Sequence, residues 1–594
     1  MDPDPAYTEA LGRLFGFGHF RPGQAEAVTA ALSDRDALVV MPTGSGKSLC
    51  YQLPALMRDD LTLVVSPLVS LMQDQVTALS AIAPGRVAVV NAQRGWGANN
   101  DAIARVRAGE VRLLYVAPER FGSPAFAAAL ADVRVGLFVV DEAHCVSQWG
   151  HDFRPDYFTL ADAAARIGAR CRLALTATAT PRVADDIARR LVLRDPLRVT
   201  TGFDRPNLSF AVIGCANAAD QERRLAAALT APDALPAIVY AGTREACEHL
   251  SRVLAHALGE PVVAYHAGMD RDARIAAQRD FMGGHAAVIV ATNAFGMGID
   301  KADVRTVCHA AVPGSLEAYY QEAGRAGRDG RPARCLLFAQ ARDKGLHVFF
   351  IERSRLTADA FARVGERLQW AGLDGRYDVP LSDLFGLTSE RGRSDADGVR
   401  AVIGHLARAG VLTPSPAPPD RAAGYITGGW DRWAAATCLA SAREAECVRW
   451  NQYRSMWGYV EGAACRRRTL LDHFGDPSVG RAEVPCCDVC EPGVVVAPPV
   501  AARDPAGRHE GGDLDRAIVE VVVRAQPLVG RVRAVEILRG ARSTVLAAHA
   551  HDSLAEYGAF AHLRADEVLE RVDGLLAAGT IRSTGGRFPK LVAP

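Results

Sequence analysis

Short, continuous apolar runs alternate with stretches of helical periodicity through roughly the first third of the chain. The runs are bounded by turn residues and read ALVVMP, TLVVSP, VAVVN, RLLYVAP, GLFVVDEAH and RLALTAT. Strands of a parallel sheet that is covered on both faces are apolar on both sides, so continuous runs favour such strands over half-exposed ones. The pattern predicts an α/β domain with a parallel sheet over residues 1–205.

The same rhythm returns over residues 206–344, with the runs AIVYAGT, VVAYHAG, AVIVATN, TVCHAAVP and RCLLFA. This second α/β segment contains no phosphate-binding loop of its own. We therefore expect it to contribute side chains to the first domain across a cleft between the two. Ligands of open α/β sheets bind at the carboxyl ends of the strands, where the motifs described below lie.

The α/β rhythm stops after about residue 345, and residues 345–491 form a different region. Residues 358–371 and 397–409 have the periodicity of amphipathic helices, and GVLTPSPAPPDRAAGYITG follows them. A helix leading into two short apolar runs around a Pro-rich loop is typical of a winged helix. Helices with an irregular loop are an equally good interpretation of the segment at about 355–430.

Two further segments complete the chain. Residues 492–512 are rich in Pro, Gly and Ala and are typical of a linker. Residues 513–594 contain two or three helical stretches and end in GTIRSTGGRFPKLVA, where a Gly-Gly turn separates two strand-like pieces. This final segment predicts a winged helix more strongly than the one at 355–430.

Composition restricts the class of protein but does not identify its function. The 594 residues include 68 basic and 68 acidic side chains, so any surface that follows a phosphate backbone must be local. The N-terminus lacks the apolar core of a signal peptide, and no apolar run is long enough to cross a bilayer. We expect a cytoplasmic protein that needs no membrane, and an arginine-rich, lysine-poor composition indicates a bacterial one.

A phosphate-binding loop follows the first apolar run, and a pair of carboxylates follows the fifth. The glycine-rich turn offers backbone N–H groups to phosphates, Lys47 suits the β- and γ-phosphates, and the Ser48 hydroxyl suits Mg²⁺. Asp141 is a second Mg²⁺ ligand, and Glu142 is placed to polarise the attacking water. Met41 stands where the generic loop has Gly. The ATP-binding residues predicted within the loop are Thr43, Gly44, Ser45, Gly46, Lys47 and Ser48.

Thirteen cysteines are present, and they are not evenly spread. Scattered single thiols up to about residue 450 fit a reducing compartment. Four more crowd between Cys465 and Cys490. Such a late cluster favours a metal site over disulfides.

Taken in order, these motifs resemble those of RecQ-family DNA helicases of superfamily 2. FRPGQ resembles the family's adenine-recognition motif and implies ATP contacts from Arg21 and Gln24. VSPLVSLMQDQ and YVAPER are similar to segments that contact the DNA backbone, and ALTATAT to one that couples ATP state to domain movement. AYHAGMD, ATNAFGMGIDKADVR and YYQEAGRAGRDG are similar to the motifs of the second domain. The resemblance implies two tandem RecA-like domains, a helical zinc module and a C-terminal winged helix of the RQC type, without a C-terminal HRDC domain.

The most diagnostic part of the resemblance is CVSQWGHDFRPDY at 145–157, which is similar to the aromatic-rich loop of RecQ enzymes. Aromatic faces can stack on unpaired bases, at about 1–3 kcal/mol per base. The alternative is that the aromatics only pack the domain interface. The residues assigned to this DNA-coupling loop are Gln148, Trp149, His151, Phe153 and Arg154.

Two arginines of QEAGRAGR lie on the second domain and can reach a γ-phosphate only across the cleft. By analogy with the family, Arg328 is the predicted arginine finger and Arg325 a second phosphate contact. The alternative is a surface salt-bridge network.

Four thiolates around Zn²⁺ form a closed structural site. The family pattern implies Cys465, Cys487 and Cys490 as three of the zinc ligands. At the position where the family has its remaining cysteine, this chain has Val484. Cys486 is the expected fourth ligand, with His473 as a possible substitute. The alternative is a cluster of buried thiols without a metal.

In the final segment the resemblance implies contacts with duplex DNA, for which Arg539, Arg542 and Arg582 are candidates. A solvated charged face is an equally good interpretation of each. The wing is short and has no aromatic tip, which argues against a stacking wedge there.

The sequence therefore predicts a monomeric, nucleoid-associated, ATP- and Mg²⁺-dependent DNA helicase that moves 3′ to 5′ on single strands and acts in repair or recombination. The rival interpretations are an RNA helicase and a DNA-binding or annealing factor that uses ATP only as a switch.

Overall fold

The computed structural model describes most of the chain. The described residues are 4–67, 69–91, 94–122, 124–147, 157, 159–296, 301–372, 374–388, 396–415, 417, 420–492, 511–541, 546, 549, 551, 554–560, 563, 565–584 and 589–593. They form two compact units, Met1–Pro498 and Pro499–Pro594, which we describe separately. No helix in the described part of the chain is long and apolar enough to span a membrane.

The first unit begins with a seven-stranded, fully parallel sheet in the order β3-β4-β2-β5-β6-β1-β7. Six of its strands are apolar and almost entirely buried, as expected for strands covered on both faces. The strands are β1 (Ala37–Val40), β2 (Leu61–Val65), β3 (Val87–Val90), β4 (Leu113–Val116), β5 (Val135–Val140), β6 (Cys171–Thr176) and β7 (Leu197–Thr200).

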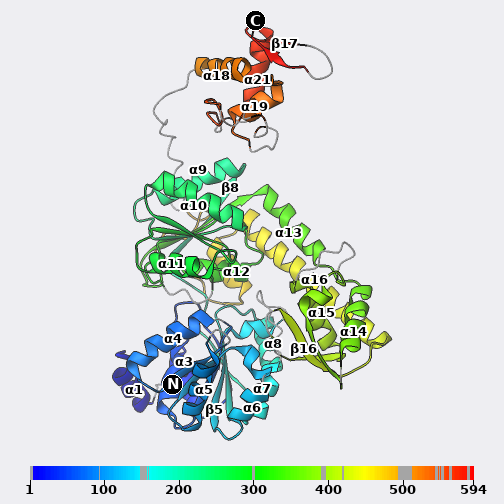
Figure 1. Ribbon diagram of the computed structural model, residues 1–594. Coiled ribbons are helices and arrows are strands. Elements are labelled where there is room, and N and C mark those ends of the chain that lie inside the picture. The colour runs from blue at the N-terminus through cyan, green and yellow to red at the C-terminus, as the bar shows by residue number, and fades with distance from the viewer. Residues whose placement is uncertain are drawn as a thin grey trace. The chain divides into compact units, whose positions relative to one another are not determined.

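Helices accompany these strands along the chain and are drawn in blue to cyan in Figure 1. They are α1 (Pro5–Phe15), α2 (Gln24–Leu32), α3 (Leu49–Met57), α4 (Val69–Ile82), α5 (Trp96–Arg107), η1 (Pro118–Gly122), α6 (Pro124–Leu130), η2 (Ala143–Val146), α7 (Leu160–Arg166) and α8 (Pro181–Arg190).

A second parallel sheet of six strands follows, in the order β10-β11-β9-β12-β13-β8. Its strands are β8 (Leu208–Cys215), β9 (Ala237–Tyr240), β10 (Val262–Tyr265), β11 (Val288–Ala291), β12 (Thr306–His309) and β13 (Ala333–Gln340). Its helices are α9 (Ala218–Leu229), α10 (Arg244–Leu258), α11 (Arg271–Met282) and α12 (Leu316–Ala323).

Local sequence fixes where many of these helices begin. A side-chain oxygen at the N-cap accepts a hydrogen bond from the backbone N–H three residues later, which satisfies a donor that the helix cannot. The capping residues of this kind include Thr180, Asn217, Thr243, Ser315, Thr357 and Asp431.

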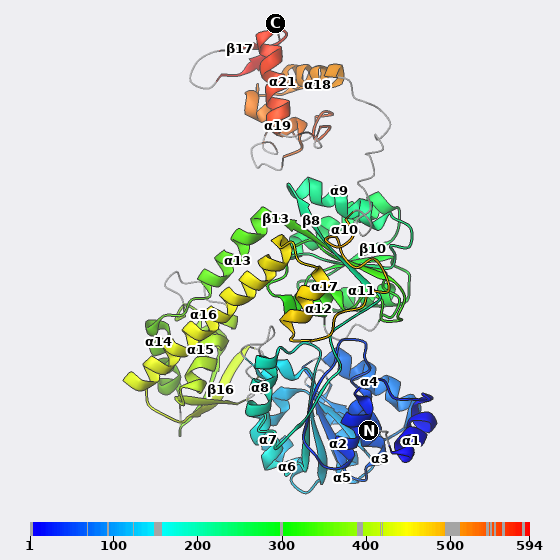
Figure 2. The ribbon, with the colours of Figure 1, turned by 180° about the vertical axis from the view of Figure 1, so that it is seen from behind.

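A helical arm and a small inserted subdomain complete the first unit. The helices α13 (Ala341–Arg353) and α16 (Arg432–Glu461) lie side by side (Figures 1 and 2), joined by a hydrogen bond from Trp457 Nε1 to His347 Nδ1 of 3.3 Å. Between them in sequence lie α14 (Ala358–Ala371), β14 (Arg376–Pro380), η4 (Leu381–Leu384), α15 (Ala396–Arg408), β15 (Leu412–Ser415) and β16 (Arg421–Ile426). The three strands form an antiparallel sheet, β14-β16-β15.

This element order is that of a winged helix, so the topology favours that interpretation of residues 355–430 over helices with an irregular loop. After α16, the chain forms α17 (Arg466–His473) and the cysteine-bearing loop beside the second sheet (Figure 2).

The second unit has its own apolar core, which includes Ile518, Val521 and Val568. Three helices, α18 (Gly511–Arg524), α19 (Arg531–Leu538) and α21 (Ala565–Ala577), accompany a two-stranded antiparallel ladder of β17 (Arg582–Ser583) and β18 (Leu591–Val592). The predicted helices and terminal strand pair are therefore confirmed.

All eleven apolar runs singled out in the two α/β segments are strands, and the helices expected at 358–371 and 397–409 are α14 and α15. Two strands, β7 and β8, have no counterpart among those runs. β7 is an edge strand whose residues alternate between exposed and buried or half-buried, so it lacks a continuous apolar run. The domain boundaries drawn from sequence stay predictions.

Candidate functional site: the interdomain ATP cleft and the cysteine cluster

The phosphate loop connects β1 to α3 at the carboxyl end of the first sheet. Gly44 and Gly46 have φ angles of 85° and 82°, a region that side-chain-bearing residues rarely adopt. A Cβ atom on Gly46 would lie 2.6 Å from Nε2 of Gln24, so the space is also closed to a side chain. Met41 is fully buried in the core, which explains why the first position of the loop tolerates it.

Lys47 lies inside this loop. Its Nζ donates hydrogen bonds to the carbonyl oxygens of Met41 (3.0 Å) and Pro42 (3.2 Å). Burial lowers the pKa of Lys47, and the nearby carboxylates of Glu142 and Asp141 oppose that shift. The ammonium and the two acids therefore share one electrostatic environment at the mouth of the loop.

The FRPGQ segment lies against the phosphate loop. Gln24 Nε2 donates to the carbonyl oxygens of Ser45 (3.2 Å) and Gly46 (3.0 Å), and Arg21 Nη1 donates to that of Gly44 (2.7 Å). The Gln24 amide oxygen accepts from the Arg21 backbone N–H at 2.8 Å. These bonds join the two predicted nucleotide-binding segments into one structure.

Asp141 and Glu142 follow β5 directly. Burial and the neighbouring Glu142 raise the pKa of Asp141 to about 7, although Lys47 acts to lower it. Glu142 has a φ of 48°, and its N–H donates to Oδ1 of Asp141 at 3.0 Å. This turn gives the two adjacent carboxylates different surroundings.

The histidine of VVDEAH connects the carboxylates to the ALTATAT segment. His144 Nδ1 lies 3.3 Å from Oε2 of Glu142 and 3.0 Å from the hydroxyl of Thr176. Burial acts to lower the pKa of His144, but the neighbouring Cys145 and Glu142 raise it to about 10. His144 thus lies between the carboxylate of Glu142 and the hydroxyl of Thr176, the last residue of β6.

The predicted DNA-coupling residues Gln148, Trp149, His151, Phe153 and Arg154 lie outside the described residues, but both flanks of their segment are described. Before it, Ser147 Oγ donates to Oδ2 of Asp186 on α8 at 2.8 Å. After it, the Tyr157 hydroxyl donates to the carbonyl oxygen of Asp141 at 3.1 Å.

The two predicted arginines occupy different positions. Arg328 lines a cavity of about 850 Å³ together with Lys47 and Asp141, and a Cβ on Gly44 would lie 3.4 Å from its Cγ. Arg325 is buried, with 3% of its surface exposed, and hydrogen-bonds the Tyr240 hydroxyl within the second domain. Arg328 thus lies at the phosphate loop, whereas Arg325 is buried inside the second domain.

Arg205, in the connection between the two sheets, was not identified from the sequence. Its guanidinium donates to the carbonyl oxygens of Thr43 (3.3 Å) and Gly324 (3.0 Å) through Nη1, and to those of Ala326 (2.9 Å) and Gly327 (3.1 Å) through Nη2. One side chain therefore ties the phosphate loop to the turn that carries Arg328. The available signal was the dense polar segment FDRPN between the two domains.

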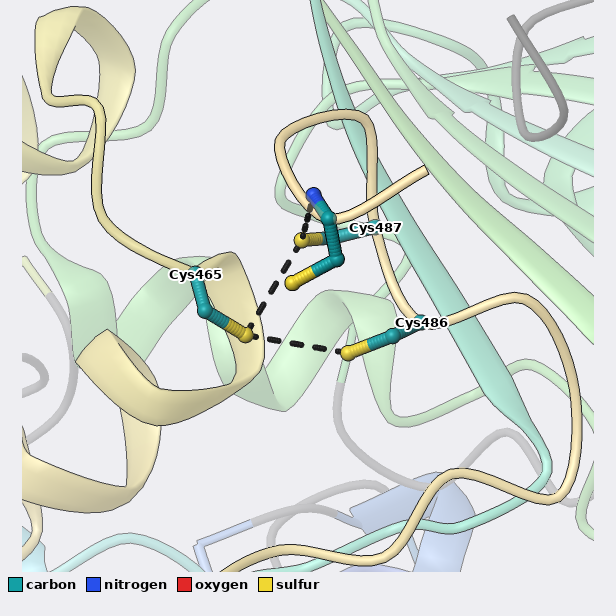
Figure 3. Close-up of side chains that lie close together, drawn as sticks. Cys465, Cys486 and Cys487 are labelled. Carbon is teal, nitrogen blue, oxygen red and sulfur yellow. Dashed lines mark hydrogen bonds between the residues drawn. The ribbon is translucent and has the colours of Figure 1, made fainter. Parts of the chain in front are cut away.

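Four thiols converge between α17 and β8, from Cys465, Cys486, Cys487 and Cys490 (three are labelled in Figure 3). All four Sγ atoms lie within 4.8 Å of one another. Cys465 Sγ is 3.7 Å from that of Cys486 and 3.9 Å from that of Cys487. A tetrahedral site with Zn–S bonds of about 2.3 Å has S···S edges of about 3.8 Å, so the thiols fit Zn²⁺.

The thiols have contrasting acidities. Burial raises the pKa of Cys486 to about 11, and hydrogen bonds to Cys487 and Cys465 raise that of Cys490. Burial also acts to raise the pKa of Cys487, but backbone N–H donors, that of Cys490 first, lower it overall. Four thiolates this close repel one another unless a cation binds between them.

The structure brings together the four cysteines expected from the sequence. Cys486 lies in the cluster despite its shift in register. His473, the possible substitute, instead pairs with Glu317 at 2.8 Å between Nε2 and Oε1.

Arg467, two residues after Cys465, joins the cluster to the connection between the sheets. It donates to the carbonyl oxygen of Arg205 at 2.8 Å, pairs with Asp204, and hydrogen-bonds Cys486. The metal-binding module is thus anchored beside the arginine that spans the cleft.

Comparison with known proteins follows the same division of the chain. Family models match a DEAD/DEAH box helicase at 21–187, a helicase conserved C-terminal domain at 222–330, a RecQ zinc-binding domain at 433–491 and an RQC domain at 509–593. These models leave the segment between residues 330 and 433 unmatched.

Two relatives match this chain over most of their own length. The ATP-dependent DNA helicase RecQ of Haemophilus influenzae is 31% identical over 93% of this chain and 72% of its own. The probable ATP-dependent DNA helicase RecS of Bacillus subtilis is 39% identical over 64% of this chain and 77% of its own. The two parallel sheets, the phosphate loop, the cysteine cluster and these matches agree: the chain belongs to the RecQ family of ATP-dependent DNA helicases.

Proposed function

We propose that the chain hydrolyses ATP in the cleft between its two sheets and uses the resulting closure and opening to move 3′ to 5′ along single-stranded DNA. Lys47 contacts the β- and γ-phosphates, and Arg21 and Gln24 contact the adenine side. Glu142 orients the attacking water. Arg328 is the arginine finger. Arg325, expected from the family to be a second phosphate contact, is buried beside Tyr240, so we assign it instead to supporting the turn that carries Arg328.

One observation carries this assignment. Arg328, from the second domain, lies against Gly44 of the phosphate loop, and Arg205 donates hydrogen bonds to Thr43 of that loop and to Gly324 of the turn before Arg328. An arginine that meets the γ-phosphate only when two domains approach makes hydrolysis depend on closure. Domain movement and chemistry are then a single coupled event.

DNA is the second ligand, and we assign its coupling to the segment between Ser147 and Tyr157. This segment begins at a hydrogen bond to α8 and ends at one to the backbone of Asp141. A strand that displaces the segment therefore acts directly on the carboxylate pair. Action in repair or recombination, as is typical of RecQ enzymes, is part of this proposal.

The metal ions have separate places. Ser48 and Asp141 supply the hydroxyl and carboxylate oxygens that Mg²⁺ takes beside phosphates and water. When bound, Mg²⁺ neutralises charge on the phosphates. Cys465, Cys486, Cys487 and Cys490 hold Zn²⁺ as a structural ion. We further propose that the protein acts as a monomer in the bacterial cytoplasm, at the nucleoid.

Strand displacement from tailed, forked and junction substrates with ATP and Mg²⁺ tests the proposal. We expect unwinding that requires a 3′ tail and that Lys47→Ala abolishes. Undiminished unwinding by Lys47→Ala would mean that ATP acts only as a switch. Equal stimulation of ATP hydrolysis by matched DNA and RNA strands would contradict the choice of DNA.

A further inference from the structure

A cavity of about 680 Å³ opens where the inserted subdomain joins the helical arm. Its walls come from the end of α13, the start of α14, α15 and the middle of α16. Most of this region lies between the matched segments that end at residue 330 and begin at residue 433. None of the described residues that line it lines the ATP cleft or belongs to the cysteine cluster, so the cavity is distinct from both.

The charges around this cavity do not balance. Both of its carboxylates are paired, since Glu446 accepts from Arg355 at 2.7 Å and Asp397 from Arg400 at 3.1 Å. Three other arginines line it and make no ion pair within the described part of the chain: Arg353, Arg443 and Arg449. His405 adds no positive charge near neutrality, because burial and the nearby arginines lower its pKa to about 4.

Arg449 is the most constrained of the three arginines. It is partly buried, and its Nε is a buried donor without an acceptor in the described structure. Burial lowers its pKa, and Glu446 only partly opposes this. A guanidinium held in this way gains more from an arriving anion than one in open water.

Aromatic surface lies at the same place. Phe350 lines the cavity with 57% of its surface exposed, and Phe349 beside it is 51% exposed. The guanidinium carbon of Arg353 lies 5.9 Å from the centre of the Phe349 ring. Exposed rings next to unpaired arginines are the combination by which proteins bind single strands, stacking on bases and following phosphates.

We propose that this cavity is a second binding site for single-stranded DNA. Arg353, Arg443 and Arg449 contact backbone phosphates, and Phe350 stacks on an unpaired base. Base faces are hidden within a duplex, so the exposed ring selects a single strand. The site would retain a separated strand outside the ATP cleft.

Salt-dependent binding of a fluorescent oligothymidylate to the full-length protein tests the phosphate contacts. Each phosphate neutralised on a single strand contributes about 0.7 to the slope of log K against log salt. We expect the exposed pair Arg353→Ala/Arg443→Ala to reduce that slope by about 1.4. Hydrolysis of ATP without DNA should be unchanged. Arg421→Ala, which removes a half-exposed arginine paired with Asp378 on the same subdomain, is the matched control.

Phe350→Ala tests the stacking contact separately. Loss of one stacked base weakens single-strand binding about 5-fold to 150-fold, and the salt slope stays as in the unaltered protein. Phe350→Trp should retain binding. The proposal is overturned if the double arginine variant keeps the full salt slope. It is also overturned if the losses appear with a blunt duplex but not with the single strand.

Discussion

The ATP cleft and the cysteine cluster are both polar sites where modules of the chain meet, yet they are assembled in opposite ways. The cleft combines side chains from residues as distant as Arg21 and Arg328, which belong to the two different α/β domains. The cluster takes all four thiols from residues 465–490, and the neighbouring Arg467 donates a hydrogen bond to the carbonyl oxygen of Arg205 in the connection between the sheets. The side chains of the cleft therefore come from two domains, whereas the thiols of the cluster come from a single module.

This difference follows from what each site does. A cleft that closes and opens in each cycle must divide its groups between bodies that can separate. A structural metal site has to keep its ligands together in both states. Arg467 donates a hydrogen bond to the backbone of Arg205, so these two arginines connect the sites. Changing each site in turn tests how independent the two are.

The largest effect is expected from Arg328→Ala. Loss of the arginine that reaches across the cleft should lower kcat for ATP hydrolysis by about 10³-fold to 10⁵-fold. Zinc content should not change. Arg331→Ala, an exposed arginine on the same turn, is the control, and steady-state hydrolysis with saturating DNA is the measurement. A larger loss of kcat in Arg325→Ala than in Arg328→Ala would reverse the two assigned roles.

The next effect concerns the other site. Replacing one thiol in Cys486→Ser should lower zinc affinity by more than about 100-fold, since loss of an outer-shell partner alone costs 10–100-fold. Metal analysis after dialysis against a chelator measures it, with Cys447→Ser, an exposed cysteine outside the cluster, as control. Full zinc retention in Cys486→Ser would exclude Cys486 from the ligands.

Arg205→Lys tests the connection between the sites. A lysine has one donor nitrogen and cannot span four carbonyl oxygens, so the finger turn should lose its register with the phosphate loop. Misplacement by about 1 Å can cost about 10²-fold in kcat. The KM for ATP and the melting temperature should change little. Arg198→Lys, at an exposed ion pair with Asp185, is the control. A fall in melting temperature that accounts for the lost activity would make Arg205 purely structural.

The smallest effect is a pH dependence confined to the cleft. The pKa of Asp141 is raised to about 7, so the carboxylate is protonated below that pH and free to bind a cation above it. Between pH 8 and pH 6, the apparent affinity for Mg²⁺ should fall about tenfold, because protons compete for the ligand. Titration of hydrolysis with Mg²⁺ at each pH measures this. Saturating Mg²⁺ should abolish the difference, and a pH-independent Mg²⁺ affinity would contradict the prediction.

Sequence patterns predicted the fold where local chemistry decides it. Continuous apolar runs identified strands such as β5, and the glycines of the phosphate loop identified a turn that no side chain could occupy. The edge strand β7 was missed because only one of its faces is buried. Arg205 was missed because its role depends on carbonyl groups brought together from two distant segments, at Thr43 and at residues 324–327, which no spacing in the sequence records.

The sequence by itself determined the two parallel-sheet domains, the phosphate loop with its carboxylates and the four cysteines, since each rests on residues close together in the chain. Only the tertiary structure decided that Arg205 joins the phosphate loop to the turn before Arg328, that Arg325 is buried, and that three arginines without an ion pair among the described residues line a cavity beside Phe350. The physical reason is distance along the chain. Hydrogen bonds, burial and charge balance between remote segments depend on how helices and sheets pack, and that packing is set by the whole core.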